Sequence, residues 1–95
     1  MSGWDAIVLD PADDVAVALR DLEAGEAARV RRGAALVEIT PSVAIALGHK
    51  LALHPIAKGA VVRKYGQPIG EATAAIAAGD HVHVHNIRSR RGRAI

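Results

Sequence analysis

The sequence contains no cysteine and no phenylalanine, and it has one tryptophan and one tyrosine in 95 residues. Without cysteine there is no disulfide framework, thiolate nucleophile or cysteine-ligated metal centre. Hydrophobic residues make up 51% of the chain, but 20 of them are Ala and 25 are Val, Ile or Leu. The core must therefore be built from small side chains. We expect one domain over residues 1–95, and a core this thin favours burial of part of the surface against a partner.

Long apolar runs are also missing. No stretch approaches the roughly 18 residues of a membrane span, and the first residues lack the basic and apolar regions of a signal peptide. We therefore expect a cytoplasmic protein that does not contact a membrane.

The net charge is only +2, but the segment 88–95 holds four arginines and no acid. This basic tail is interpreted either as a frayed, solvated terminus or as a contact for phosphate, nucleic acid or an acidic partner. It has no aromatic residues on which bases could stack, so nucleic acid is not the expected partner. The ordered core is expected at about 5–88.

A repeated turn is the most informative pattern in the sequence. An apolar residue, two further residues and a glycine occur together three times, ending at Gly25, Gly59 and Gly79. A glycine at a fixed place after an apolar residue indicates a positive φ or a close backbone approach. Repeated units of this size predict a small β domain with internal pseudo-symmetry.

Local propensity and periodicity disagree about secondary structure. Residues 12–24 and 71–78 are rich in helix formers, whereas the side chains alternate at 15–19 and 81–85, which favours strands. The four prolines and nine glycines leave no room for long helices. We predict a mainly β domain with at most a short helical turn, at 41–47 or after Ile69. Strands are expected at residues 6–9, 15–20, 28–31, 35–40, 49–53, 60–64, 69–74 and 81–87, joined by turns at 23–26, 32–34, 57–59, 65–68 and 77–80.

Three histidines alternate with two valines at positions 81–85. In a strand, this alternation would place His81, His83 and His85 on one face and both valines in the core. Neutral imidazole is a common metal ligand. However, alternate Cβ atoms lie roughly 6.5–7 Å apart, so one metal bridges them only with favourable rotamers. A metal site and a half-exposed polar face both remain open.

Cationic side chains beside glycines form a second kind of candidate site. His49 and Lys50 follow Gly48, and Lys64 and Tyr65 precede another glycine. Glycine lets an anion approach the backbone closely. No nucleophile elbow, P-loop or dinucleotide fingerprint is present, and the acids form no obvious acid–base pair. The chain is equipped to bind an anion but not to catalyse a reaction alone.

Four short motifs combine into a longer pattern: Gly48-His49-Lys50, Lys64-Tyr65-Gly66, Ile69-Gly70-Glu71-Ala72-Thr73 and His81-Val82-His83-Val84-His85-Asn86. This pattern resembles the SAF-type domain of the altronate/galactarate dehydratase family. The same module forms the small subunit of two-subunit members such as sulfolactate sulfo-lyase. The resemblance implies a compact β-clip fold, similar to the type III antifreeze domain, which agrees with the pseudo-symmetric repeat. In one departure, residues 41–47 lack the Ile-Pro-x-Gly segment that leads into the first motif in this family.

The resemblance also implies a function. It indicates a metal-dependent lyase, using ferrous iron or manganese, that removes water or sulfite from a sugar acid or hydroxy acid. The larger catalytic region of the family is not part of this sequence. We therefore expect a small accessory subunit that is inactive alone and works with a larger catalytic subunit; the initial Met and the short tail favour a separate subunit over an excised domain. The alternative is a non-catalytic module that binds anions or carbohydrates, and a homo-oligomer is left open.

The resemblance assigns roles to the residues that match the motifs. His83 and His85 are the expected catalytic residues, and they are also the expected metal ligands. Residues expected to bind the substrate are His49, Lys50, Lys64, Tyr65 and Asn86. His81 is the least secure position of the last motif, because the family is tolerant there.

Overall fold

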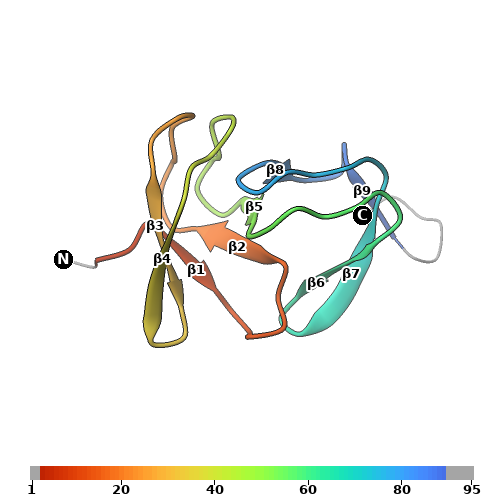
Figure 1. Cartoon of the computed structure of the whole chain (residues 1–95), viewed down its shortest axis with the longest axis horizontal. Helices are drawn as coiled ribbons and strands as arrows, with labels where there is room; N and C mark the ends of the chain where they lie inside the picture. The colour runs from red at the N-terminus through yellow and green to blue at the C-terminus, as the bar shows by residue number, and fades with distance from the viewer. Residues whose placement is uncertain (1–2, 90–95) are drawn as a thin grey trace.

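Figure 1 shows the computed structural model, which describes residues 3–89. The nine strands found there are β1 (Ala6–Val8), β2 (Val15–Ala18), β3 (Ala28–Arg32), β4 (Ala35–Ile39), β5 (Lys50–Ala52), β6 (Val61–Lys64), β7 (Gln67–Ala72), β8 (His81–Val82) and β9 (Ile87–Arg88). They form a six-stranded sheet in the order β4-β3-β1-β2-β5-β8 and a three-stranded sheet in the order β6-β7-β9. The β3–β4 hairpin stands at one end of the molecule and the three-stranded sheet at the other (Figure 1).

The mainly β prediction is confirmed. No helix occurs within residues 3–89, so the short helical turn allowed at 41–47 or after Ile69 does not form. None of the described segments is a helix long and apolar enough to cross a membrane. The basic tail beyond residue 89 lies outside the described residues. The expected domain limits of 1–95 stay a prediction.

The strand predicted at 81–87 is wrong as one element. It splits into β8 and β9, which belong to different sheets, with a turn over residues 83–86 between them. The side chain of Asn86 causes the break, because it hydrogen-bonds the backbone of His81 and His83 and so folds the chain back on itself. Val84 therefore lies on the turn with 53% of its surface exposed, not in the core, whereas Val82 is fully buried.

The repeated turn is confirmed, and the structure contains a fourth copy that ends at Gly48. The apolar residues of the four copies pair as two isolated bridges, Leu22 with Ile45 and Ile56 with Ile76. In each bridge the two backbones exchange hydrogen bonds of 2.7–3.0 Å. The glycine that ends each copy has a φ between +80° and +86°, a conformation that costs glycine little and other residues more. The two bridges give the fold its pseudo-symmetry.

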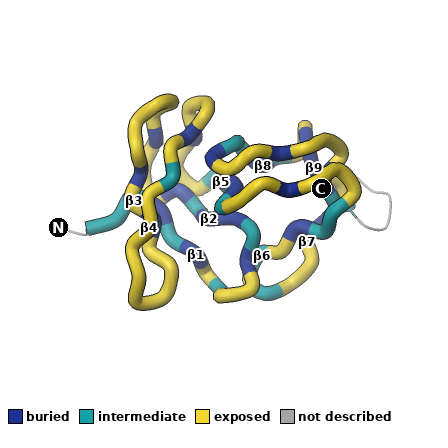
Figure 2. Tube along the Cα trace, viewed as in Figure 1, coloured by how far each residue is buried: buried dark blue, intermediate teal, exposed yellow. Residues whose placement is uncertain are grey.

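Two clusters of buried side chains form the core. The first comprises Ala6, Val8, Ala16, Ala18, Leu22, Ala28, Val30, Ile45 and Leu51. The second comprises Val15, Ala52, Ile56, Val62, Ala72, Ile76, Val82 and Ile87. Strands β2 and β5 contribute neighbouring residues to both clusters, so they lie between them. Most strands carry buried positions, except β4, whose residues are exposed or half-buried, and the long loops are largely exposed (Figure 2). The expectation of a core built from small side chains is confirmed.

Candidate functional site

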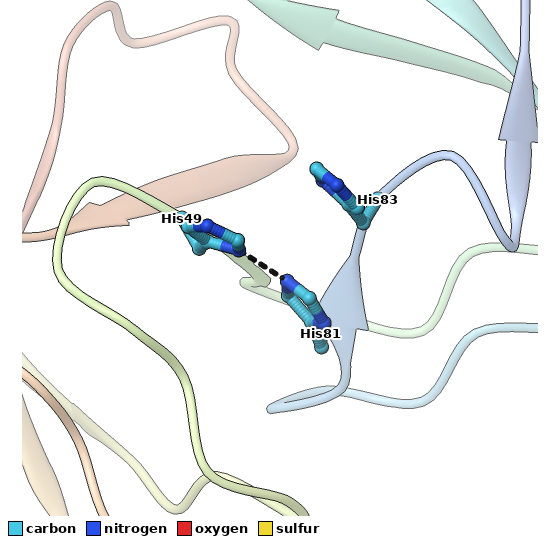
Figure 3. A group of neighbouring side chains, drawn as sticks. All are labelled: His49, His81 and His83. Carbon is cyan, nitrogen blue, oxygen red and sulfur yellow. Dashed lines mark hydrogen bonds between the residues drawn. The ribbon is translucent and has the colours of Figure 1, made fainter. Parts of the chain in front are cut away.

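Three histidines meet where β5 and β8 lie side by side. These strands are antiparallel, with Leu51 opposite His81. Continuing this register places His49, just before β5, opposite His83, just after β8 (Figure 3). Nδ1 of His49 lies 2.9 Å from Nε2 of His81, so one of these nitrogens carries a proton and donates a hydrogen bond to the other. The ring centroids of the three histidines are 5.0–5.3 Å apart.

One ligand atom from each of His49, His81 and His83 lies within 4.8 Å of the other two. We call these residues the histidine triad; each is half-buried. His85 lies beside the triad, with its ring centroid 5.5 Å from that of His81 and the ring tilted by 40°. It is exposed on the turn.

Asn86 holds the backbone of the triad in place. Its Oδ1 accepts a hydrogen bond from the backbone N–H of His83 at 2.9 Å, and its Nδ2 donates to the carbonyl of His81 at 2.8 Å. Only 9% of Asn86 is exposed. Both polar groups of this side chain are thus engaged within the turn, where they fix the direction in which two of the imidazoles leave the backbone.

Positive groups gather around the triad. The pKa of His81 lies below its ordinary value because the ring is partly buried, and also because the three neighbouring imidazoles and the ammonium of Lys50 repel a further positive charge. Partial burial also lowers the pKa of Lys50, and the charge of Lys64 lowers it further. A bound carboxylate would reverse these effects, because it favours the charged form of each group.

The triad, His85, Lys50 and Lys64 form what we call the cluster. No carboxylate of the described residues forms an ion pair with it. The ion pairs within residues 3–89 are Arg20–Asp5, His54–Asp14 and Arg88–Glu71. A group of lysines and histidines without an acidic partner is suited to an anionic ligand.

Lys64 and Tyr65 lie at the tip of the β6–β7 hairpin. Lys64 pairs with Gln67 across a two-residue loop in which Tyr65 and Gly66 have φ values of +57° and +71°. Positive φ at both loop residues is typical of the tight turns that suit twisted hairpins. The Nζ of Lys64 lies 5.0 Å from the centre of the Tyr65 ring, within the range of a cation–π contact.

A buried aspartate fixes this hairpin tip. The carboxylate of Asp13 accepts a hydrogen bond from the backbone N–H of Tyr65 at 3.0 Å and another from Gly66 at 2.8 Å. Only 2% of Asp13 is exposed. No local pattern of the sequence marks Asp13, because its partners are more than 50 positions further along the chain.

The best-formed hollows of the described surface lie elsewhere. They are lined by residues of the β1–β2 loop with Arg32 and Gly33, by Trp4 with the β3–β4 turn, and by Lys58 with Arg88. None of their lining residues belongs to the histidine triad or is Lys50 or Lys64. The triad and Lys50 are half-buried and so keep part of their surfaces exposed to solvent.

The altronate/galactarate dehydratase SAF domain family matches residues 4–90. The chain belongs to this family. Altronate dehydratase of Escherichia coli (strain K12) is 53% identical over 77 residues, which is 81% of this chain and 15% of the relative. Altronate dehydratase of Bacillus subtilis (strain 168) is 41% identical over the same length, with the same two shares. The (2R)-sulfolactate sulfo-lyase subunit alpha of Chromohalobacter salexigens is 46% identical over 48 residues, which is 50% of this chain and 51% of that subunit.

The family resemblance inferred from the four motifs is thus confirmed, and the two-sheet, all-β architecture is consistent with an SAF β-clip domain. The SAF domain spans only about 15% of the length of the altronate dehydratases that it matches.

The structure gathers most of the residues predicted for the site. His49 and Lys50 lie at the start of β5, and His83 and His85 lie on the turn after β8. Lys64, at the end of β6, contributes to the lowered pKa of Lys50. His81, ranked least secure from the sequence, lies at the centre of the imidazoles. The roles predicted for these residues, including metal binding by His83 and His85, stay predictions.

The donor chemistry of the triad fits one of the two expected metals better. Imidazole nitrogen suits iron, zinc, copper and nickel, whereas manganese prefers carboxylate, carbonyl and water oxygen. The triad offers three imidazoles, and no carboxylate belongs to the group of ligand atoms found in the described residues. Ferrous iron therefore fits these residues, and manganese would need oxygen ligands from elsewhere.

Proposed function

We propose that this SAF domain is the accessory part of a lyase that acts on sugar acids or hydroxy acids. In this proposal the domain contributes cationic and imidazole groups to a site that a larger catalytic subunit completes. The observation that carries the proposal is the group of four imidazoles beside Lys50, which lacks an acidic partner in the described residues. The charge of Lys64 acts on Lys50 as well. The family membership supports it.

The chemistry of elimination explains why such a cluster is useful. Loss of water from a hydroxy acid removes a proton beside the carboxylate and expels a hydroxyl group, so negative charge grows on the carboxylate oxygens. In this proposal Lys50 and Lys64 bind that carboxylate and stabilise the added charge. His83 or His85, once protonated and not bound to a metal, donates a proton to the departing hydroxyl. We assign the orientation of the hydroxyl groups of the substrate to His49 and Tyr65.

A metal belongs to this proposal as part of the complete enzyme. Ferrous iron or manganese, when bound, polarises a carboxylate or hydroxyl oxygen of the substrate as a Lewis acid. Of the two, ferrous iron suits the imidazoles of this domain.

In this proposal a larger partner covers the cluster, whose imidazoles and Lys50 keep part of their surfaces exposed. Tyr65 on the β6–β7 hairpin and Val84 on the turn after β8 expose 63% and 53% of their surfaces. A covering surface would bury these apolar groups and exclude water, which strengthens every charge interaction within the site. Two relatives are named as the alpha subunit of a sulfo-lyase, which supports a partner supplied as a separate chain.

The test is reconstitution in two parts. Altronate dehydratase of Escherichia coli, expressed without the segment that matches this chain, is mixed with the 95-residue chain and assayed on altronate, galactarate and sulfolactate. We expect activity on one of these substrates only when both parts are present. Lys50→Ala and Lys64→Ala should raise KM for that substrate, whereas His54→Ala, an exposed histidine outside the cluster, should leave it unchanged.

Equal activity with and without the chain would contradict the accessory role. Tight binding of a sugar acid by the chain in metal-free buffer, without any gain in turnover, would instead favour the non-catalytic binding module.

A further inference from the structure

We infer that His49, His81 and His83 bind one first-row divalent metal ion through their imidazole nitrogens, and that His85 lies outside the ligand set. The sequence had indicated His83 and His85 instead. This inference deepens the proposed function, because it concerns the same site. It is tested by metal binding and not by turnover, so either can fail without the other.

The spacing of the rings matches that of a shared metal. For imidazoles bound to one tetrahedral ion through bonds of 2.0–2.1 Å, ring centroids lie about 5.2 Å apart. The three centroid distances in the triad are 5.1, 5.0 and 5.3 Å. The backbone thus already places the three rings at the corners of a triangle of the required size.

The ligand atoms must be rearranged to bind one ion, because the proton between Nδ1 of His49 and Nε2 of His81 has to leave that contact. Bound nitrogens would lie about 3.3–3.4 Å apart in tetrahedral geometry, whereas the candidate atoms of the triad lie within 4.8 Å of one another. The ring planes differ by only 10–26°, so at least one ring must turn about its Cβ–Cγ bond for the lone pairs to converge.

Two independent features hold the backbone of the triad in place. Pairing of β5 with β8 fixes the distance between His49 and His81. The two hydrogen bonds of Asn86 fix His81 relative to His83. Metal sites depend on such supporting contacts, because they limit the entropy lost when the ligands converge.

The ligand count points to a reactive site and not to a structural one. Structural zinc sites have four protein ligands, whereas catalytic sites have three and leave a position for water or substrate. The triad supplies three nitrogens, and the nearby ammonium of Lys50 attracts an anion to the open position. The ligand type favours iron, cobalt, nickel, copper or zinc over magnesium, calcium or manganese.

The experiment titrates the tag-free 95-residue chain with Co²⁺, whose visible absorption reports coordination number and ligand type, and repeats the titration with Zn²⁺ by calorimetry. We expect one metal per chain and a cobalt spectrum typical of low coordination number. His49→Ala, His81→Ala and His83→Ala should each abolish that spectrum, whereas His85→Ala and the surface control His54→Ala should retain it. Asn86→Ala should weaken binding by roughly 10–100-fold, as expected when a supporting contact of the ligands is lost.

Three results would overturn the inference. The first is an unchanged cobalt spectrum in His49→Ala, and the second is an equal loss in His85→Ala and His83→Ala. Far-UV circular dichroism shows whether each variant folds, and His49→Gln and His83→Gln replace any alanine variant that does not. An absence of saturable one-to-one binding by the folded wild-type chain would also overturn it.

Discussion

Replacement of Asp13 should cost a large part of the stability of the fold. Asp13 is 2% exposed, and its carboxylate accepts two backbone hydrogen bonds at the tip of the β6–β7 hairpin. A hydrogen bond to a charged group contributes about 1.5–3 kcal/mol. Asp13→Ala removes two of these bonds, but water can reach part of the freed N–H groups. We therefore expect a loss of about 3–5 kcal/mol, against a total of about 5–14 kcal/mol for a chain of this length.

The assay is urea unfolding followed by far-UV circular dichroism. Asp13→Asn keeps one acceptor oxygen and should lose about half as much as the alanine variant. Glu26→Gln removes the charge of an exposed acid and serves as the control, with a change within about 0.5 kcal/mol. If Asp13→Ala also stays within that range, the hairpin tip does not depend on this carboxylate and the reasoning is refuted.

Replacement of Asp13 should also change the pKa of Lys50 at the candidate site. Lys64 precedes the hairpin tip, and its charge contributes to the lowered pKa of Lys50. Loosening of the tip would let the two ammonium groups separate, so the pKa of Lys50 should rise toward its ordinary value. Titration of the lysine side chains by NMR in a folded Asp13→Asn variant measures this shift; an unchanged pKa would mean that Asp13 does not position Lys64.

Two further predictions concern the backbone and the pH dependence of stability. Gly79→Ala should destabilise the chain by more than about 2 kcal/mol, because a Cβ there would collide with the carbonyl oxygen of Thr40. Gly25→Ala has open space around it and should cost only the roughly 1 kcal/mol of its left-handed φ; equal losses measured by urea unfolding would contradict this difference. The backbone N–H of Arg29 lowers the pKa of Asp5, and the guanidinium of Arg20 lowers it further. The ionised Asp5 side chain therefore stabilises the fold at pH values above the ordinary pKa of an aspartate. The destabilisation by Asp5→Asn should therefore be full near pH 7 and shrink as the pH falls below about 4; a loss that is independent of pH would show that the charge does not matter.

Features set by neighbouring residues could be predicted from the sequence. The strands and the glycine turns follow from alternation and from the position of each glycine, because both depend on residues a few positions apart. The fourth turn, at Gly48, was missed because that glycine had been assigned to the anion-binding motif alone. The strand over 81–87 failed because the alternation of His and Val does not reveal that the Asn86 side chain folds the backbone.

The composition of the site depended on contacts between distant residues. His49 and His81 become neighbours only through the pairing of β5 with β8, which the sequence did not specify. For this reason the central place of His81 was not foreseen. The link between Asp13 and the hairpin tip joins residues from opposite halves of the chain. The family motifs named the segments that carry these side chains, but the strand pairing decided which of the side chains meet.

The most direct test of the proposed accessory role is one comparison of turnover. In a chimera, this chain replaces the matching segment of the altronate dehydratase of Escherichia coli, and kcat is measured on altronate. The account predicts an active chimera in which His83→Ala lowers kcat at least tenfold, while His54→Ala leaves it unchanged. A folded chimera that turns over altronate equally well with His83→Ala would contradict the claim that this cluster takes part in the reaction.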